Sequence, residues 1–193
     1  MAKILILDNG SQYTHLIKRN CRDLDFDAEI INSKSEDSIL KKMDEFDKII
    51  ISGGPSSVYL DKPTICNKIV ELIRDGKITK PLLGICYGQQ LIAHVFGAKV
   101  ANGKSAEYGM CKVRITKKES KLFKCVPREI TAWVSHFDEV KEVPKGFEIT
   151  AESESCKIEG MENNRLQIYS VQFHPEVWHT ESGEQIIKNF LTI

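Results

Sequence analysis

The segment Pro81-Leu82-Leu83-Gly84-Ile85-Cys86-Tyr87-Gly88-Gln89-Gln90 joins an apolar run to an amphipathic stretch that ends at Phe96. A strand, a sharp turn and a helix in this order form a nucleophile elbow, in which Cys86 takes the position that a hydrolase gives to its serine. Such a turn strains the backbone of the nucleophile and brings its neighbours close, so it requires small residues such as Gly84 and Gly88. The start of the following helix also favours the thiolate form of Cys86. The segment therefore predicts a candidate nucleophile at the end of a strand.

The first half of the chain repeats this alternation of strand and helix. We predict strands at Lys3–Leu7, Ala28–Ile31, Asp47–Ser52 and 81–85, and helices at Thr14–Leu24, Ser38–Met43, Thr64–Arg74 and 87–96. Short apolar strands separated by helices imply right-handed crossovers and a mostly parallel sheet that is covered on both faces. The fold class that follows is α/β, with a doubly wound, flavodoxin-like sheet.

After Gly97 the pattern changes to short strands without helices between them. These strands are expected at Lys112–Thr116, Glu129–Val134, Phe147–Ala151, Cys156–Met161 and Gln167–Phe173, with a turn at Asn163-Asn164 and a final helix at Glu184–Leu191. They predict a small antiparallel extension of the sheet, part of it folded over one edge as a smaller layer. Because no repeat, low-complexity tract or linker interrupts the chain, we expect residues 1–193 to form a single domain.

Composition excludes several classes of function. The 27 basic and 27 acidic residues cancel, which leaves no electrostatic footprint for nucleic acid or a membrane surface. The apolar runs are far shorter than the roughly 18 residues of a membrane span, and Asp8 comes too early for a signal peptide. The six cysteines have no CxxC spacing, so we expect reduced thiols in a cytoplasmic protein.

Two sequence pairs could supply the base that a cysteine nucleophile needs. His174-Pro175-Glu176 and His136-Phe137-Asp138 each place a histidine and an acid two residues apart, where both side chains share one face of a strand. Chain order does not choose between the two pairs. Pro175 stiffens the first pair through its fixed φ, which favours His174 with Glu176 as its orienting carboxylate.

The loop Ser52-Gly53-Gly54-Pro55 follows the third predicted strand. A tight turn alone accounts for this sequence. However, parallel sheets bind ligands at the carboxyl ends of their strands, so the loop also lies where a Gly53-Gly54 amide could face Cys86. This amide and that of Tyr87 would then form an oxyanion hole. The loop contains no lysine and no GxxxxGK pattern, which argues against a phosphate site.

These motifs together resemble those of class I glutamine amidotransferases and, more narrowly, of the glutaminase parts of GMP synthetases. The resemblance covers nearly the whole chain and rests on residues 6–13, 52–59, 84–90, 133–136 and 174–180. Relatives that make anthranilate or aminodeoxychorismate usually have Pro-Gly-Pro and His-Pro-Glu-Ser instead, and neither is present. One departure is Gln89, where the family more often has methionine or histidine.

The resemblance implies that the chain hydrolyses glutamine through a thioester on Cys86. It makes His174 the base and Glu176 its orienter, and it places Ser135, His136 and Phe137 beside the amino-acid end of the bound glutamine. It also gives Gln90 a supporting role. No metal or cofactor is implied in this chain.

A GMP synthetase further needs an ATP-pyrophosphatase part, which uses ATP and Mg²⁺ to adenylate XMP. Its Ser-Gly-Gly-x-Asp-Ser loop does not occur here, so we expect that activity on a separate partner protein, the alternative being that this chain is a domain excised from a longer enzyme. The polar segments Asn102–Gly109 and His179–Gly183 are the expected contacts with this partner. Two alternatives stay open at this point: a stand-alone hydrolase of small amides, and a non-catalytic regulatory module with the same fold.

Overall fold

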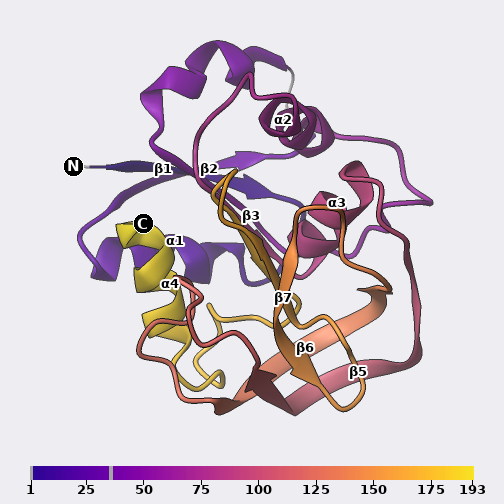
Figure 1. Ribbon diagram of the computed structural model, residues 1–193. Helices are drawn as coiled ribbons and strands as arrows, with labels where there is room; N and C mark the ends of the chain where they lie inside the picture. The colour runs from indigo at the N-terminus through magenta and orange to yellow at the C-terminus, as the bar shows by residue number, and fades with distance from the viewer. Residues whose placement is uncertain (1, 35–36) are drawn as a thin grey trace.

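The computed structural model describes residues 2–34 and 37–193, and this part of the chain forms a nine-stranded sheet with helices on both faces (Figure 1). The strands are β1 (Lys3–Asp8), β2 (Asp27–Asn32), β3 (Lys48–Ile51), β4 (Leu82–Ile85), β5 (Val100–Ile115), β6 (Glu129–Val140), β7 (Glu148–Ser153), β8 (Gly160–Asn163) and β9 (Ile168–Val171). The helices are α1 (Thr14–Asp23), the 3₁₀-helix η1 (Asp37–Glu45), α2 (Ile65–Arg74), α3 (Tyr87–Val95) and α4 (Gly183–Thr192). The strand order is β2-β1-β3-β4-β9-β8-β7-β5-β6. None of the described helices is long and apolar enough to cross a membrane.

The first five strands in this order, β2, β1, β3, β4 and β9, are parallel to one another. The central strands β3 and β4 are buried along their whole length, which explains their continuous apolar sequences. Strand β9 comes from near the end of the chain, yet it pairs directly with β4 in the register Gly84↔Ser170 and Ile85↔Val171. This pairing brings the residues after β9 next to Cys86.

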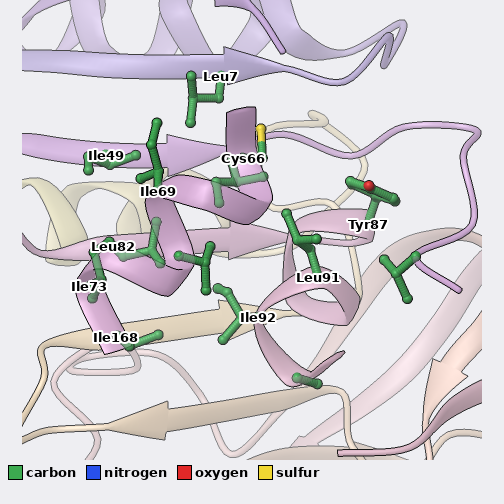
Figure 2. Close-up of a cluster of buried hydrophobic side chains, with 14 of the residues drawn as sticks. Leu7, Ile49, Cys66, Ile69, Ile73, Leu82, Tyr87, Leu91, Ile92 and Ile168 are labelled. Atoms are coloured by element: carbon green, nitrogen blue, oxygen red, sulfur yellow. The ribbon is translucent and has the colours of Figure 1, made fainter. Parts of the chain in front are cut away.

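Alternate residues of the parallel strands enter two separate cores, one on each face of the sheet. One core joins Leu5, Leu7, Ile49, Ile51 and Leu82 to side chains of α2, α3 and η1. Figure 2 shows this packing, with Ile69 and Ile73 of α2 and Leu91 and Ile92 of α3 against the strands. The other core joins Ile4, Ile6, Ile50, Leu83 and Ile85 to side chains of α1 and α4. The predicted doubly wound α/β fold is confirmed.

The second half of the sheet contains antiparallel strands, as predicted. The prediction of a smaller layer folded over one edge is wrong, because all of these strands continue the main sheet. The hairpin of β5 and β6 is much longer than predicted, since residues 100–111, which mix polar and apolar side chains, also belong to β5. An irregularity between Asn102 and Glu107 interrupts the pairing of β5 with β6. These residues escaped prediction because their side chains do not alternate between apolar and polar.

Two smaller predictions need correction. Cys156 does not begin a strand, because Ser153 Oγ accepts the Cys156 N–H at 2.9 Å and forms a local turn before β8 starts at Gly160. Asn163 is the last residue of β8, so the turn begins one residue later, at Asn164. The weak helix expected at Ser38–Met43 exists as the 3₁₀-helix η1.

Helix α3 lies close to the backbone of the sheet because two glycines permit it. A Cβ on Gly88 would lie 2.5 Å from the carbonyl oxygen of Ile51, and one on Gly84 would lie 2.6 Å from Ile92 Cδ1. Neither distance is compatible with a side chain. The small residues around Cys86 therefore allow the helix to start directly at the sheet.

Replacing Gly88 with alanine should displace the elbow and lower the free energy of unfolding by about 1–3 kcal/mol, because the new Cβ collides with backbone. Gly97→Ala is the matched control just beyond the same helix. Gly97 has a φ of +85° but open space around it, so this change should cost about 1–2 kcal/mol of backbone strain without moving Cys86. Urea unfolding measures the stability of both variants, and peptide mass spectrometry measures Cys86 alkylation. Equal alkylation rates in both variants would contradict the prediction.

Candidate active site

Cys86 occupies a strained turn between β4 and α3. Its φ of 53° and ψ of −105° lie in a region that side chains with a Cβ rarely adopt. The backbone N–H of Cys86 donates to the carbonyl of Val171 in β9 at 2.8 Å, which continues the β4–β9 pairing into the turn. Its thiol lies 3.8 Å from the carbonyl oxygen of Ser135. The turn thus presents Cys86 at the carboxyl end of the sheet, beside the first turn of α3.

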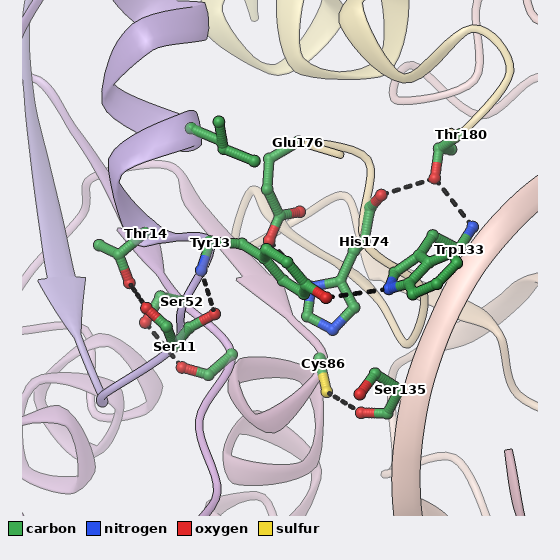
Figure 3. Close-up of polar contacts among 12 residues, drawn as sticks. Ser11, Tyr13, Thr14, Ser52, Cys86, Trp133, Ser135, His174, Glu176 and Thr180 are labelled. Atoms are coloured by element: carbon green, nitrogen blue, oxygen red, sulfur yellow. Dashed lines mark hydrogen bonds and ion pairs between the residues drawn. The ribbon is translucent and has the colours of Figure 1, made fainter. Parts of the chain in front are cut away.

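His174 and Glu176 follow β9 and form a buried pair. His174 Nδ1 lies 2.8 Å from Glu176 Oε1, and both side chains are almost inaccessible to solvent. A Cβ on Gly53 would lie 3.0 Å from His174 Cε1 and 3.5 Å from Cys86 Cβ, so this glycine leaves room for both side chains. Figure 3 shows the imidazole of His174 between the side chains of Glu176 and Cys86.

Neighbouring residues fix the backbone and ring of His174 (Figure 3). Its N–H donates to the carbonyl of Trp133 at 2.9 Å, and its carbonyl accepts from Thr180 Oγ1 at 2.7 Å. The ring of Tyr13 packs edge-on against the imidazole with centroids 5.0 Å apart. Trp133 Nε1 donates to the Tyr13 hydroxyl at 3.1 Å, so the tyrosine is itself held in place. Few other rotamers are open to His174.

The two histidines of the site have opposite electrostatic surroundings. Burial disfavours the charged form of His174, but the negative charges of Glu176 and Cys86 outweigh it and raise the pKa of His174 well above its usual value. For His136 burial dominates and lowers the pKa to about 4. At neutral pH His136 is therefore neutral, whereas His174 favours the protonated form that pairs with a carboxylate and a thiolate.

The competing pair predicted from the sequence does not form a comparable contact. The Asp138 carboxylate accepts hydrogen bonds from Ser57 Oγ at 3.0 Å and from the Tyr59 hydroxyl at 2.8 Å. His136 instead directs Nε2 toward Glu107 Oε2 at 3.0 Å. The structure thus brings His174, and not His136, together with its sequence-adjacent acid.

The Gly53-Gly54 loop is tied to the segment after β1. Asn9 N–H donates to Ser52 Oγ at 3.0 Å, and Ser52 Oγ donates to the Gly53 carbonyl at 2.8 Å. A Cβ on Gly54 would lie 2.5 Å from the Asn9 carbonyl oxygen, so only glycine fits there.

Sequence reasoning gave no role to Asn9, Ser52 or Tyr13. Their position after the carboxyl ends of parallel strands was the signal that could have identified them.

A pocket of about 760 Å³ lies over Cys86. Of the residues predicted for the site, those that line it are Gly54, Cys86, Gln90, Ser135, His136, Phe137 and His174. Glu176 lies behind His174, and the ring of Tyr87 is buried in the core with α2 and α3 (Figure 2), which leaves only its backbone for the site. The pocket is formed by the segments that follow β1, β3, β4 and β9, by Gln90 of α3, and by residues within β5 and β6.

The two glutamines of the elbow helix have different surroundings. Gln90 lines the pocket, and its Nε2 donates to the Asp138 carbonyl at 2.7 Å and to Gln172 Oε1 at 3.3 Å. Gln89 is fully buried away from the pocket, where its Nε2 donates to the Ile158 carbonyl at 2.7 Å and its Oε1 accepts from Ser170 Oγ at 3.0 Å. Gln89 therefore connects α3 with β9 and with the segment before β8.

Comparisons with known proteins agree with this geometry. A family model described as glutamine amidotransferase class-I matches residues 5–193. One subunit of the glutamine-hydrolyzing GMP synthase of Pyrococcus abyssi is 46% identical over 187 residues, which cover 97% of this chain and 96% of that protein. The corresponding subunit of Methanocaldococcus jannaschii is 44% identical over 190 residues, with 98% and 96% covered.

Solved structures show the same likeness. A putative GMP synthase subunit of Thermoplasma acidophilum superimposes with a TM-score of 0.88 at 37% identity, covering 100% of this chain and 93% of that one. A glutamine amidotransferase of Thermotoga maritima gives a TM-score of 0.77 at 22% identity, covering 99% and 81%. At this lower identity the likeness concerns the fold alone.

Glu176→Gln should weaken the protein most where His174 is charged. Because the folded pKa of His174 is raised above its unfolded value of about 6.5, its contribution to stability is complete below about pH 6.5. That contribution is lost as the pH rises through the folded pKa. The difference in free energy of unfolding between wild type and Glu176→Gln should therefore be largest below about pH 6.5 and shrink as the pH rises through the folded pKa of His174. Urea unfolding at each pH measures it, with the exposed Glu71→Gln as control. A difference that does not vary with pH would contradict the assignment.

Proposed function

The chain belongs to the class I glutamine amidotransferase family, and we propose that it is the glutaminase subunit of a two-subunit GMP synthase. It hydrolyses glutamine to glutamate and ammonia, and a separate subunit uses the ammonia to convert XMP to GMP. The observation that carries this proposal is the placement of Cys86, in its strained elbow, beside the buried His174–Glu176 pair. The similarity to subunits of glutamine-hydrolyzing GMP synthases over nearly their whole length supports the choice of pathway.

The reaction follows from the chemistry of the three residues. The Cys86 thiolate attacks the carboxamide carbon of glutamine, and protonated His174 gives its proton to the departing nitrogen as the C–N bond breaks. Ammonia leaves and a glutamyl thioester remains on Cys86. Neutral His174 then takes a proton from water, whose oxygen attacks the thioester and releases glutamate. Glu176 holds the imidazole through Nδ1, which directs Nε2 toward the reacting atoms.

Two backbone amides, those of Tyr87 and Gly54, would stabilise the oxyanion of each tetrahedral intermediate. Tyr87 is the first residue of α3, so its N–H belongs to the helical turn that has no intrahelical acceptor. The Gly53 carbonyl accepts a hydrogen bond from Ser52 Oγ. The Gly54 N–H belongs to the same planar trans peptide, so it points in the direction opposite to this carbonyl. Together they supply the two donors that acyl transfer requires.

The amino-acid end of glutamine would lie at the β6 side of the pocket. Ser135 and Phe137 line this side, and the Ser135 carbonyl already lies beside the Cys86 thiol. Both ring nitrogens of His136 are buried away from solvent, so His136 would contribute through its backbone. Gln90 anchors the same strand from α3 by its bond to the Asp138 carbonyl.

The partner subunit would cover the mouth of the pocket. Leu60 and Tyr108 are 78% and 73% exposed although both line the pocket, and Phe137 is half-exposed beside them. Exposed apolar side chains at an active-site rim are typical of an interaction surface. Tyr108 belongs to the segment 102–109 expected to make this contact. The other expected segment, His179–Gly183, lies outside the pocket.

Cys86→Ala should abolish ammonia release from glutamine, because no other thiol lines the pocket within the described residues. Cys125→Ala, which removes an exposed thiol, is the matched control and should retain full activity. An electrophilic glutamine analogue should add once to the wild type, at Cys86, as seen by mass spectrometry. Ammonia release by Cys86→Ala at the wild-type rate would refute the proposed nucleophile.

Glutaminase activity should rise when the ATP-pyrophosphatase subunit is added, and further with XMP, ATP and Mg²⁺. A rise of about tenfold corresponds to only about 1.4 kcal/mol of coupling between the two sites. Tyr108→Ala should reduce the activation, whereas Ile149→Ala, which removes an exposed apolar side chain outside the pocket and outside both expected contact segments, should not. Ammonia release is measured for each combination. Equal rates with and without the partner would indicate a stand-alone hydrolase.

A further inference from the structure

Three ionisable side chains meet beneath the β6 wall of the pocket. Glu107 of β5 and His136 of β6 are direct partners across the hairpin, and Glu159 reaches them from the segment before β8. One ligand atom of each side chain lies within 4.8 Å of the others. The cluster is distinct from the Cys86, His174 and Glu176 triad, although His136 also borders the pocket.

Glu107 Oε1 accepts a hydrogen bond from Ser155 Oγ, but the other polar atoms of this cluster have no hydrogen-bond partner within the described part of the chain. Glu159 is fully buried and both of its carboxylate oxygens lack a partner. Both ring nitrogens of His136 and the Oε2 atom of Glu107 are also buried without one. Since nearly all buried polar atoms in proteins are hydrogen-bonded, five such atoms at one place require an explanation.

Among the side chains that the structure describes, no cation supplies the missing interaction. Among the described residues, no lysine or arginine forms an ion pair with Glu107 or Glu159, and the lysine of the adjacent strand end, Lys141, pairs with Glu139 at 2.6 Å. A fully buried carboxylate such as Glu159 is costly without a counter-charge, and the partly buried Glu107 places a second carboxylate beside it. A positive ion between them would remove that cost.

The geometry also fits a coordinated ion. His136 Nε2 and Glu107 Oε2 are 3.0 Å apart, yet their orientation does not make a hydrogen bond. Two ligands that each lie about 2.1 Å from a metal ion, at a right angle, are separated by about 3.0 Å. We propose that Glu107, His136 and Glu159 form a binding site for a divalent transition-metal ion.

The ligand types narrow the choice of ion. One imidazole nitrogen and two carboxylates suit Zn²⁺, Mn²⁺ and related ions, with coordination positions left for water. Ions such as Mg²⁺ and Ca²⁺ prefer oxygen ligands alone. The bound ion would fix His136 and hence the neighbouring Ser135, whose carbonyl lies beside Cys86. The site itself does not depend on the proposed glutaminase reaction.

Mn²⁺ is the suitable probe, because Zn²⁺ would also bind the six free thiols of the chain. Titration of the full chain with Mn²⁺, followed by electron paramagnetic resonance of the free ion, should show one bound ion per chain. Glu159→Gln keeps the shape of the side chain and should weaken binding on the order of tenfold or more. Glu154→Gln changes an exposed glutamate on the same connection and should bind Mn²⁺ like the wild type.

A second measurement separates loss of the site from loss of the fold. Mn²⁺ should raise the melting temperature of the wild type and of Glu154→Gln, but not that of Glu159→Gln or Glu107→Gln. Glu107 is less buried than Glu159, so its substitution disturbs the fold less. Wild-type protein that binds no Mn²⁺ at millimolar concentration would overturn the proposal. Equal Mn²⁺ affinity in wild type and in folded Glu159→Gln or Glu107→Gln would overturn it as well.

Discussion

The parallel pairing of β9 with β4 is the interaction on which the site depends. It sets Ile85 opposite Val171 and extends into the elbow through the Cys86 N–H to Val171 carbonyl bond at 2.8 Å. One strand therefore ends in the nucleophile, and its neighbour leads to the histidine and the carboxylate. Because hydrogen bonds of a parallel ladder fix the register, a slip of a single residue would turn His174 to the opposite face of the sheet. The relative positions of Cys86, His174 and Glu176 therefore depend on the register of β4 and β9.

Two further features surround this pairing: helix α3 packs closely against the sheet, and the pKa values of the two histidines of the pocket are shifted in opposite directions. Glycines at 84 and 88 allow α3 to begin against the backbone of β3 and β4, and this position holds Cys86 at a positive φ. In the same pocket, burial of His174 is outweighed by the negative charges of Glu176 and Cys86, which raise its pKa, whereas burial dominates at His136 and lowers its pKa. Two identical side chains are thus held in different protonation states by their surroundings alone.

Much of this arrangement could be predicted from the sequence, because local patterns carry it. Strands β1, β3 and β4, helices α1 to α3 and the elbow follow from apolar periodicity and from the glycines around Cys86. The position of β9 next to β4, the long β5–β6 hairpin and the turn at Ser153 depend on contacts between distant segments or on side-chain-to-backbone bonds. The same reason hides the cluster of Glu107, His136 and Glu159, whose members have no regular spacing along the chain. Residue Gln89, which departs from the family pattern, is explained only by its buried partners at Ile158 and Ser170.

Strand β9 lies near the end of the sequence, and this position affects how the chain folds. Strand β4 ends at residue 85, but the strand that pairs with its free edge starts at residue 168, so most of the chain must be synthesised before the two can meet. Long-range pairing of this kind slows folding, and until it forms, β4 is an apolar edge open to aggregation. During the same interval Cys86 has no histidine beside it. The order of the strands therefore keeps the thiol separate from its base in every nascent chain until the sheet is complete.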